Sequence, residues 1–286
     1  MKEMLSKDIF YATKPCFQSI TNHAKIKVLS KGIACVALGL RVSHLIDIAH
    51  LNLDQAQQLS RNLQKIPMCR ETILLVQFKD RFTFVCNKKR MKEHYEETML
   101  LHPHALTFIA VEGKEPVQHK EAPAHVVHWL SQKLYPQLTK EVCYFDKVPP
   151  FMVALNGWFL EYPVIYTTHS IHDDPEGELD EWEVKPNCLG GRTLHVIRPC
   201  IQDIVFFDDD HSSNEDALFS FSCPEGTLDR QHLELMKQNL KLKIDQRLDD
   251  LDRLSKDVVK RNSNNHNKKW TCQIQVENVS LDRFAL

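Results

Sequence analysis

The segment from residue 148 to residue 172 constrains the fold most, because Glu161 is its only formally charged side chain. Its length is close to the ~20 apolar residues that a helix needs to cross a bilayer. Helix-breaking residues interrupt it in the pairs Pro149-Pro150, Asn156-Gly157 and Tyr162-Pro163. A carboxylate near the middle of a bilayer is also costly. The segment therefore predicts short buried elements of a folded protein and no membrane span.

Composition and charge are those of an ordinary folded chain. Of the 286 residues, 43% are hydrophobic and 26% are charged, which is enough to bury a substantial core. The 36 lysines and arginines nearly balance the 38 acidic residues, for a formal net charge of −2. Because no strong basic field surrounds the chain, we expect no nucleic-acid partner, and any partner of that kind or anionic membrane surface would have to bind a local basic patch.

The nine cysteines are odd in number, irregularly spaced and without a CxxC pair. This pattern matches neither a disulfide framework nor a structural zinc module, so it predicts free thiols in a reducing compartment. The first residues, Met1 to Asp8, mix charges of both signs and lack the apolar core of a secretory signal. A cytoplasmic location follows as an expectation.

The first half of the chain predicts strands that alternate with helices. Apolar runs predict strands at 42–49, 71–78 and 81–86. The short Lys79-Asp80 link between the last two suits a hairpin. Asn52, followed three residues later by Gln55, predicts the start of a helix after the first strand. This strand-helix-strand unit has the order of a right-handed parallel crossover.

The second half predicts strands without intervening helices, at 162–168, 193–198, 204–207 and 218–223. Such strands pair antiparallel. Apolar residues then recur at steps of three or four, which predicts one long helix over 227–261. The expected fold class is mixed α/β (α+β), with an N-terminal strand-helix-strand part at 1–145. A mainly antiparallel sheet with the long C-terminal helix follows at 146–286, across a soft boundary that also allows a single domain.

Signature motifs of common enzymes are missing: no GxGxxG follows a strand, and no GxxxxGK[ST], HExxH or GxSxG occurs. Asp47 stands near the C-terminal end of the first predicted strand, where α/β sheets gather catalytic groups, and it is the catalytic candidate. An aspartate after a strand also serves as a turn or cap acceptor, and that structural role is the favoured interpretation.

Histidines and aspartates would form a metal site if the ends of two predicted strands met at one sheet edge. The candidate ligands are His169, His172, Asp208, Asp210 and His211. Imidazole together with carboxylate suits zinc, manganese or iron. The two histidines lie on a polar loop without evident partners to orient their rings, so solvated loops are the favoured interpretation. We therefore expect no bound cofactor.

The run ALNGWFLEYPVIY at 154–166 resembles a vertebrate family of uncharacterised proteins named after human chromosome 1 open reading frame 74. The strand and aspartate at Leu45-Ile46-Asp47 and the overall length are also similar to that family. The resemblance implies a soluble eukaryotic protein of unknown function and carries over no catalytic residue. The same run is explained physically as core architecture, because Trp158 can anchor a core.

Two function hypotheses from different classes follow. The favoured one is a non-catalytic interaction or scaffold protein with a protein partner, because enzyme signatures are missing and the net charge is near neutral. The alternative is a metal-assisted hydrolase, in which a carboxylate positions metal or water and a histidine acts as acid or base. Convergence of Asp47 or the two loop histidines with the 208–211 group in a concave pocket would favour the enzyme.

Overall fold

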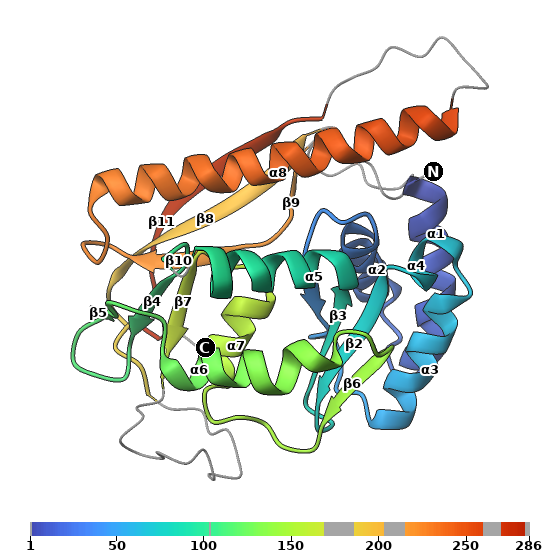
Figure 1. Cartoon of the computed structure of the whole chain (residues 1–286), viewed down its shortest axis with the longest axis horizontal. Coiled ribbons are helices and arrows are strands. Elements are labelled where there is room, and N and C mark those ends of the chain that lie inside the picture. The colour runs from blue at the N-terminus through green and yellow to red at the C-terminus, as the bar shows by residue number, and fades with distance from the viewer. Residues whose placement is uncertain (1, 103, 169–185, 203–214, 260–269, 284–286) are drawn as a thin grey trace.

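The computed structural model describes residues 2–102, 104–168, 186–202, 215–259 and 270–283 (Figure 1). Within these ranges the chain forms a mixed α/β fold with three sheets. The last of the three sheets is antiparallel, and a long C-terminal helix runs along it. The predicted fold class is therefore confirmed.

Among the three N-terminal helices α1 (Lys2–Thr13), α2 (His23–Ala37) and α3 (Leu53–Gln64), α1 packs on both of the others. The short 3-10 helix η1 (Lys14–Phe17) follows α1 in the chain, and the short helix α4 (Pro67–Arg70) follows α3. The start of α3 is the predicted capping box. Asn52 Oδ1 accepts from the Gln55 N–H at 2.8 Å, and Gln55 Oε1 accepts from the Asn52 N–H at 3.0 Å.

The first sheet has the order β1 (Ser43–Leu45), β3 (Phe82–Asn87), β2 (Ile73–Phe78), β6 (Val142–Phe145). β2 and β3 form the predicted hairpin, with Lys79 at φ 47° in its turn. The expected parallel crossover is wrong, because β1 pairs antiparallel with β3 and the parallel partner of β2 is β6. The hairpin places β3 between the first strand and β2, so those two strands do not meet.

The second sheet has the order β5 (Val117–Gln118), β4 (Thr107–Ala110), β7 (Val164–Thr167). The prediction that β7 pairs antiparallel with later strands is wrong, because it lies parallel to β4. The connection between them contains α6 (Ala124–Trp129) and α7 (Met152–Phe159), and long helical connections are what join parallel strands. The division into 1–145 and 146–286 stays a prediction.

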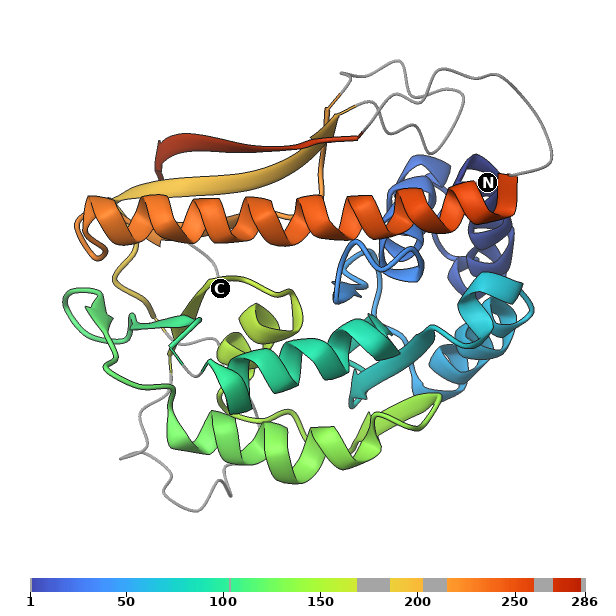
Figure 2. The same ribbon diagram turned by 45° about the horizontal axis from the view of Figure 1, so that its top comes forward.

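The third sheet has the order β10 (Phe221–Pro224), β8 (Thr193–Gln202), β11 (Cys272–Ser280), with β9 (Glu215–Ala217) also beside β8. All its pairings are antiparallel, as predicted. The strand expected at 204–207 lies outside the described residues. The helix α8 (Arg230–Val259) runs along this sheet and contacts β11 (Figure 2). Its buried stripe contains Leu240, Ile244, Leu248 and Leu251.

Two helices change from α to π geometry along their length. α5 (Lys88–Tyr95) continues into the π-helix η2 (Glu96–Leu101). α6 continues into the π-helix η3 (Leu130–Leu134) and the short η4 (Tyr135–Gln137). The two meet at Tyr95, whose hydroxyl donates to Ser131 Oγ at 3.0 Å and whose ring stacks on Tyr135 at 4.2 Å. Segments of π-helix are rare and are frequent at functional sites.

The buried apolar residues form one cluster with members from all three sheets. All nine cysteines are free thiols, as predicted.

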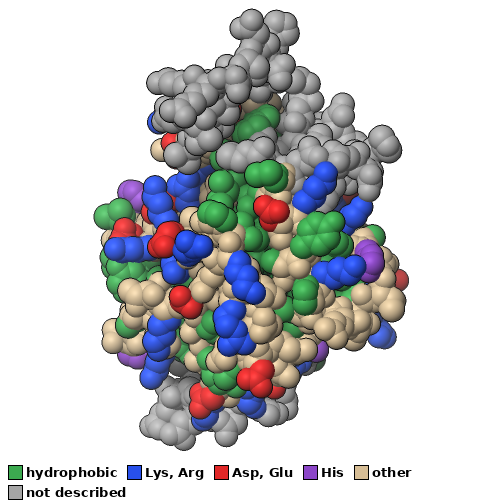
Figure 3. Space-filling view, turned by 90° about the vertical axis from the view of Figure 1, so that its right-hand side faces the viewer, with side chains coloured by type: hydrophobic (Ala, Val, Ile, Leu, Met, Phe, Trp, Pro, Cys, Tyr) green, Lys and Arg blue, Asp and Glu red, His purple; other side chains and the backbone are tan. Residues whose placement is uncertain are grey.

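The segment 148–172 divides into α7, a turn at Glu161 and β7, followed by residues outside the described ranges. Within the described ranges, no helix has the length and apolar character needed to cross a membrane. On the face shown in Figure 3, basic and acidic side chains are interspersed with hydrophobic ones, in keeping with the balanced charge.

Candidate functional site

A cavity of about 1020 Å³ lies between α8 and the continuous helix α5–η2. Its lining also includes β4 with the loop before it, the chain after β5, and the turn at Glu161. We call this space the α8 cavity. Its volume is at the upper end of the range found for small-molecule sites, so it is large enough for a ligand or for part of a partner protein.

Glu161 lines this cavity because of how α7 ends. The Glu161 N–H donates to the Trp158 carbonyl at 3.0 Å, and the Tyr162 N–H donates to the Gly157 carbonyl at 2.9 Å. These two bonds form a Schellman motif, in which the residue after the helix cap is usually a left-handed glycine. Glu161 occupies that position with φ 62°. A side chain there is unfavourable for the backbone, which points to a role for the carboxylate itself.

The Glu161 carboxylate is buried and binds two cations of α8. Arg247 donates from Nη1 to Oε2 at 2.7 Å and from Nη2 to Oε1 at 2.6 Å. Lys243 Nζ lies 3.0 Å from Glu161 Oε1 and donates to Glu97 Oε2 on η2 at 2.6 Å. Burial would raise the pKa of Glu161, but Arg247 and Lys243 outweigh it and hold the pKa well below its ordinary range. The ionised carboxylate thus ties α8 to the turn after α7.

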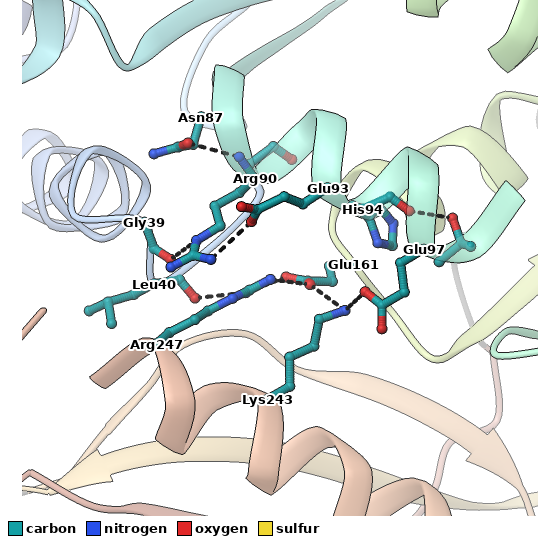
Figure 4. A network of polar contacts seen from close by, with 12 residues as sticks. Gly39, Leu40, Asn87, Arg90, Glu93, His94, Glu97, Glu161, Lys243 and Arg247 are labelled. Atoms are coloured by element: carbon teal, nitrogen blue, oxygen red, sulfur yellow. Dashed lines mark hydrogen bonds and ion pairs between the residues drawn. The ribbon is translucent and has the colours of Figure 1, made fainter. Parts of the chain in front are cut away.

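Two arginines also bind carbonyl groups where α2 ends. Arg90 on α5 donates from Nε to the Gly39 carbonyl at 3.0 Å, and Arg247 donates from Nη1 to the Leu40 carbonyl at 3.2 Å. Cations are favourable at this end of a helix, because the helix dipole is negative there. Figure 4 shows that these contacts bring together α2, α5, the turn at Glu161 and α8.

Arg90 completes the cluster on the side of α5. Its Nη1 donates to Glu93 Oε2 at 2.9 Å, and its Nη2 lies 3.5 Å from Asp250 Oδ2 on α8. We refer to these two neighbouring groups of ion pairs together as the charged network; its members are Arg90, Glu93 and Asp250 in one group and Glu97, Glu161, Lys243 and Arg247 in the other. The helix α8 contributes two cations and one carboxylate to this network. It therefore pairs with carboxylates of its neighbours through Lys243 and Arg247, and with a cation of α5 through Asp250.

His94 lies beside the charged network and is 2% exposed. Its Nε2 donates to the Trp158 carbonyl at 3.0 Å, a tautomer we assign because a carbonyl only accepts, and this leaves the lone pair on Nδ1. Burial lowers the pKa of His94 to about 4, so the ring is neutral at pH 7. In the described part of the chain, Nδ1 has no hydrogen-bond partner. A buried acceptor without a hydrogen bond is unfavourable for stability. His94 is also one of the residues that line the α8 cavity.

Of the site residues predicted from the sequence, only Asp47 lies within the described part of the chain. Asp47 is exposed two residues after β1 and does not line the α8 cavity. The metal candidates His169, His172, Asp208, Asp210 and His211 lie outside the described residues, so the favoured solvated loops and the alternative metal site both stay predictions. Among the side chains that the structure does describe, no group of three or more His, Cys, Asp or Glu could hold a metal ion.

Sequence reasoning missed the charged network, although one signal of it was present. Glu161 is the only formal charge in a long apolar segment, and such a residue needs a partner when it is buried. Lys243 and Arg247 adjoin Ile244 and Leu248 of the apolar stripe predicted for the long helix. Cations along the edge of a buried helix face are the partners that this lone carboxylate required.

Comparison with known proteins finds one family. The model of a family described as "Domain of unknown function (DUF4504)" matches residues 18–265. No curated protein and no solved structure gives a significant match. The matched range contains the whole charged network and His94, so the α8 cavity is a feature of the matched domain.

Proposed function

Because the chain belongs to the family of the domain of unknown function DUF4504, whose description assigns no activity, we propose a function from the chemistry of the cavity. We propose a non-catalytic interaction or scaffold protein that binds its partner in the α8 cavity. The apolar wall formed by two leucines of α8 carries this proposal.

Leu235 and Leu242 are seven residues apart, so they lie two turns apart on one face of α8. Both line the cavity and both are exposed. Large exposed apolar side chains with a polar surround are typical of surfaces that bind a protein or a ligand. Together with the charged network, they form a cavity with apolar walls and a few convergent polar groups, the usual composition of a binding site.

The protonation states of Glu161 and His94 favour a binding role over acid-base catalysis for these two groups. A general acid or base is most effective when its pKa is near the working pH. Ion pairing holds the pKa of Glu161 well below its ordinary range, and burial lowers the pKa of His94 to about 4. Each group therefore keeps one protonation state around pH 7, which suits recognition of a partner.

Two finer expectations belong to the same proposal. The nine free thiols support a cytoplasmic location, because disulfides are rare in that compartment. The run at 154–166 supports membership of the family named after human chromosome 1 open reading frame 74, and it lies within the matched domain.

Replacing Leu242 with aspartate is expected to weaken partner binding about tenfold or more, because the new carboxylate must lose water when the partner docks. The matched control is Val28→Asp on α2, since Val28 and Leu242 are each 66% exposed and Val28 does not line the cavity. Partners captured by the tagged chain would be purified, and their Kd measured for the wild type and both variants. Unchanged binding by Leu242→Asp, or equal loss in both variants, contradicts the cavity as the binding site.

Elemental analysis separates the interaction role from the metal-assisted hydrolase. A site at His169 and His172 would hold near-stoichiometric zinc or manganese, which the double variant His169→Ala/His172→Ala would lose. We expect no stoichiometric metal and no change in thermal stability on adding zinc, because the sequence shows no partners that would orient these rings. One metal per chain, lost in the double variant with an unchanged circular dichroism spectrum, would overturn the non-catalytic proposal.

A further inference from the structure

The middle of the α8 cavity presents carboxylates outward and keeps its cations beneath them. The exposed side-chain fractions are 43% for Glu93, 40% for Glu97 and 39% for Asp250. They are only 16% for Arg90, 28% for Lys243 and 6% for Arg247. All six line the cavity. An ionised carboxylate only accepts hydrogen bonds, so in this part of the cavity an entering ligand meets these three acceptors before the three cations beneath them. Two exposed lysines, Lys89 and Lys120, also line the cavity.

His94 adds an independent acceptor at the same place. Its Nε2 is occupied by the Trp158 carbonyl, while Nδ1 is buried and has no donor within the described part of the chain. Figure 4 shows the imidazole projecting from α5 toward the space beside Glu161 and Lys243. Any group that satisfies Nδ1 must donate a hydrogen bond.

Because His94 Nδ1 lacks a donor and the exposed carboxylates can accept further hydrogen bonds, we propose that the middle of the α8 cavity receives the guanidinium group of an arginine from a segment of a protein partner. A guanidinium group has five N–H donors and no acceptor, and its planar shape suits carboxylates that approach from two sides. Here α5–η2 supplies Glu93 and Glu97, and α8 supplies Asp250. Apolar residues on either side of that arginine would contact Leu235 and Leu242. This inference rests on the proposed function.

Besides Arg90, the exposed Lys89 pairs with Glu93 and would compete with the guest for it. Its Nζ lies 3.7 Å from Glu93 Oε1, and its side chain is exposed. An exposed pair of this kind contributes at most about 1 kcal/mol, so a guanidinium group with several acceptors can displace it. Removing the Lys89 charge is therefore expected to strengthen binding of the guest.

Two labelled peptides test the proposal on the full chain. Both carry leucines on either side of a central residue, which is arginine in one and its uncharged analogue citrulline in the other. We expect fluorescence anisotropy to give a Kd for the arginine peptide that is lower than that of the citrulline peptide by a factor of about ten or more, as for a charge-assisted contact. Glu97→Gln should remove most of this preference, and Lys89→Met should increase affinity severalfold. The control Glu112→Gln changes an exposed carboxylate outside the cavity and should have no effect.

Several outcomes would overturn the proposal. Equal affinity for the two peptides, no binding of either at millimolar concentration, or tighter binding of a peptide with central glutamate each reject an arginine guest. A further case is that the wild type binds both peptides equally and Leu242→Asp abolishes this binding. The cavity is then a binding site, and only the arginine guest is rejected. If the arginine preference survives Leu242→Asp and captured partners also stay bound, the leucine wall is rejected and the acceptor site stands. Thermal melting of each variant confirms folding, and Glu93→Gln replaces Glu97→Gln if the latter does not fold.

Discussion

Replacing Glu161 with alanine is expected to lower the free energy of unfolding by about 3–5 kcal/mol. The substitution leaves Arg247 buried without its carboxylate, and a buried unpaired charge is far more unfavourable than a broken surface pair. Urea unfolding followed by circular dichroism measures the change. A loss below about 1 kcal/mol would show that the charged network contributes no more than exposed ion pairs do.

Two further variants separate the charge of Glu161 from its backbone conformation. Glu161→Gly removes the same carboxylate but suits φ 62°, so it is expected to be about 1 kcal/mol more stable than the alanine variant. Adding Arg247→Met to Glu161→Ala removes the unpaired cation and should recover much of the lost stability. If the double variant is no more stable than Glu161→Ala alone, the loss arises in the turn and not from the unpaired charge.

Acidification from pH 7 to pH 5 is expected to destabilise the chain through His44 and His94. Burial, and then the neighbouring Arg41 cation, lower the pKa of His44 to about 3, while burial lowers the pKa of His94 to about 4. Unfolded imidazole groups have a pKa near 6.5, so below this pH the unfolded state binds protons that the folded state does not. The two histidines therefore do not lower the free energy of unfolding above pH 6.5. As the pH decreases below 6.5, the free energy of unfolding falls by about 1.4 kcal/mol per pH unit for each histidine, until the pH reaches the pKa of that histidine in the folded state.

Urea unfolding at pH 7, 6 and 5 measures this slope, and His94→Gln is expected to remove about half of it. His128→Gln is the control, because His128 is exposed. Glu161 contributes in the same direction only as the pH falls toward its unfolded value of 4.5, so the window above pH 5 reports mainly on the histidines. Stability that is independent of pH in this window would contradict the neutral state of both rings.

Local signals in the sequence determined the start of α3, the β2–β3 hairpin and the long helix α8. The capping box needs only Asn52 and Gln55, and the hairpin needs only a short polar link between two apolar runs. The stripe of α8 repeats at the helical period, so it is evident without its partner surface. The free cysteines were likewise evident from their number and spacing. In each case the residues that decide the feature are neighbours in the chain.

Only the tertiary structure decided strand partners and the site. Periodicity predicts that a strand exists but does not name its partner, so the parallel pairing of β7 with β4 could not be predicted from either strand. His44 fits against Gly32, where an added Cβ would lie 2.5 Å from the ring, and this contact joins a strand to the middle of a helix. Glu161 and Arg247 are 86 positions apart. The sequence shows that Glu161 needs a partner, because a buried carboxylate must be paired, but packing of α8 against the turn after α7 determines which cation it meets.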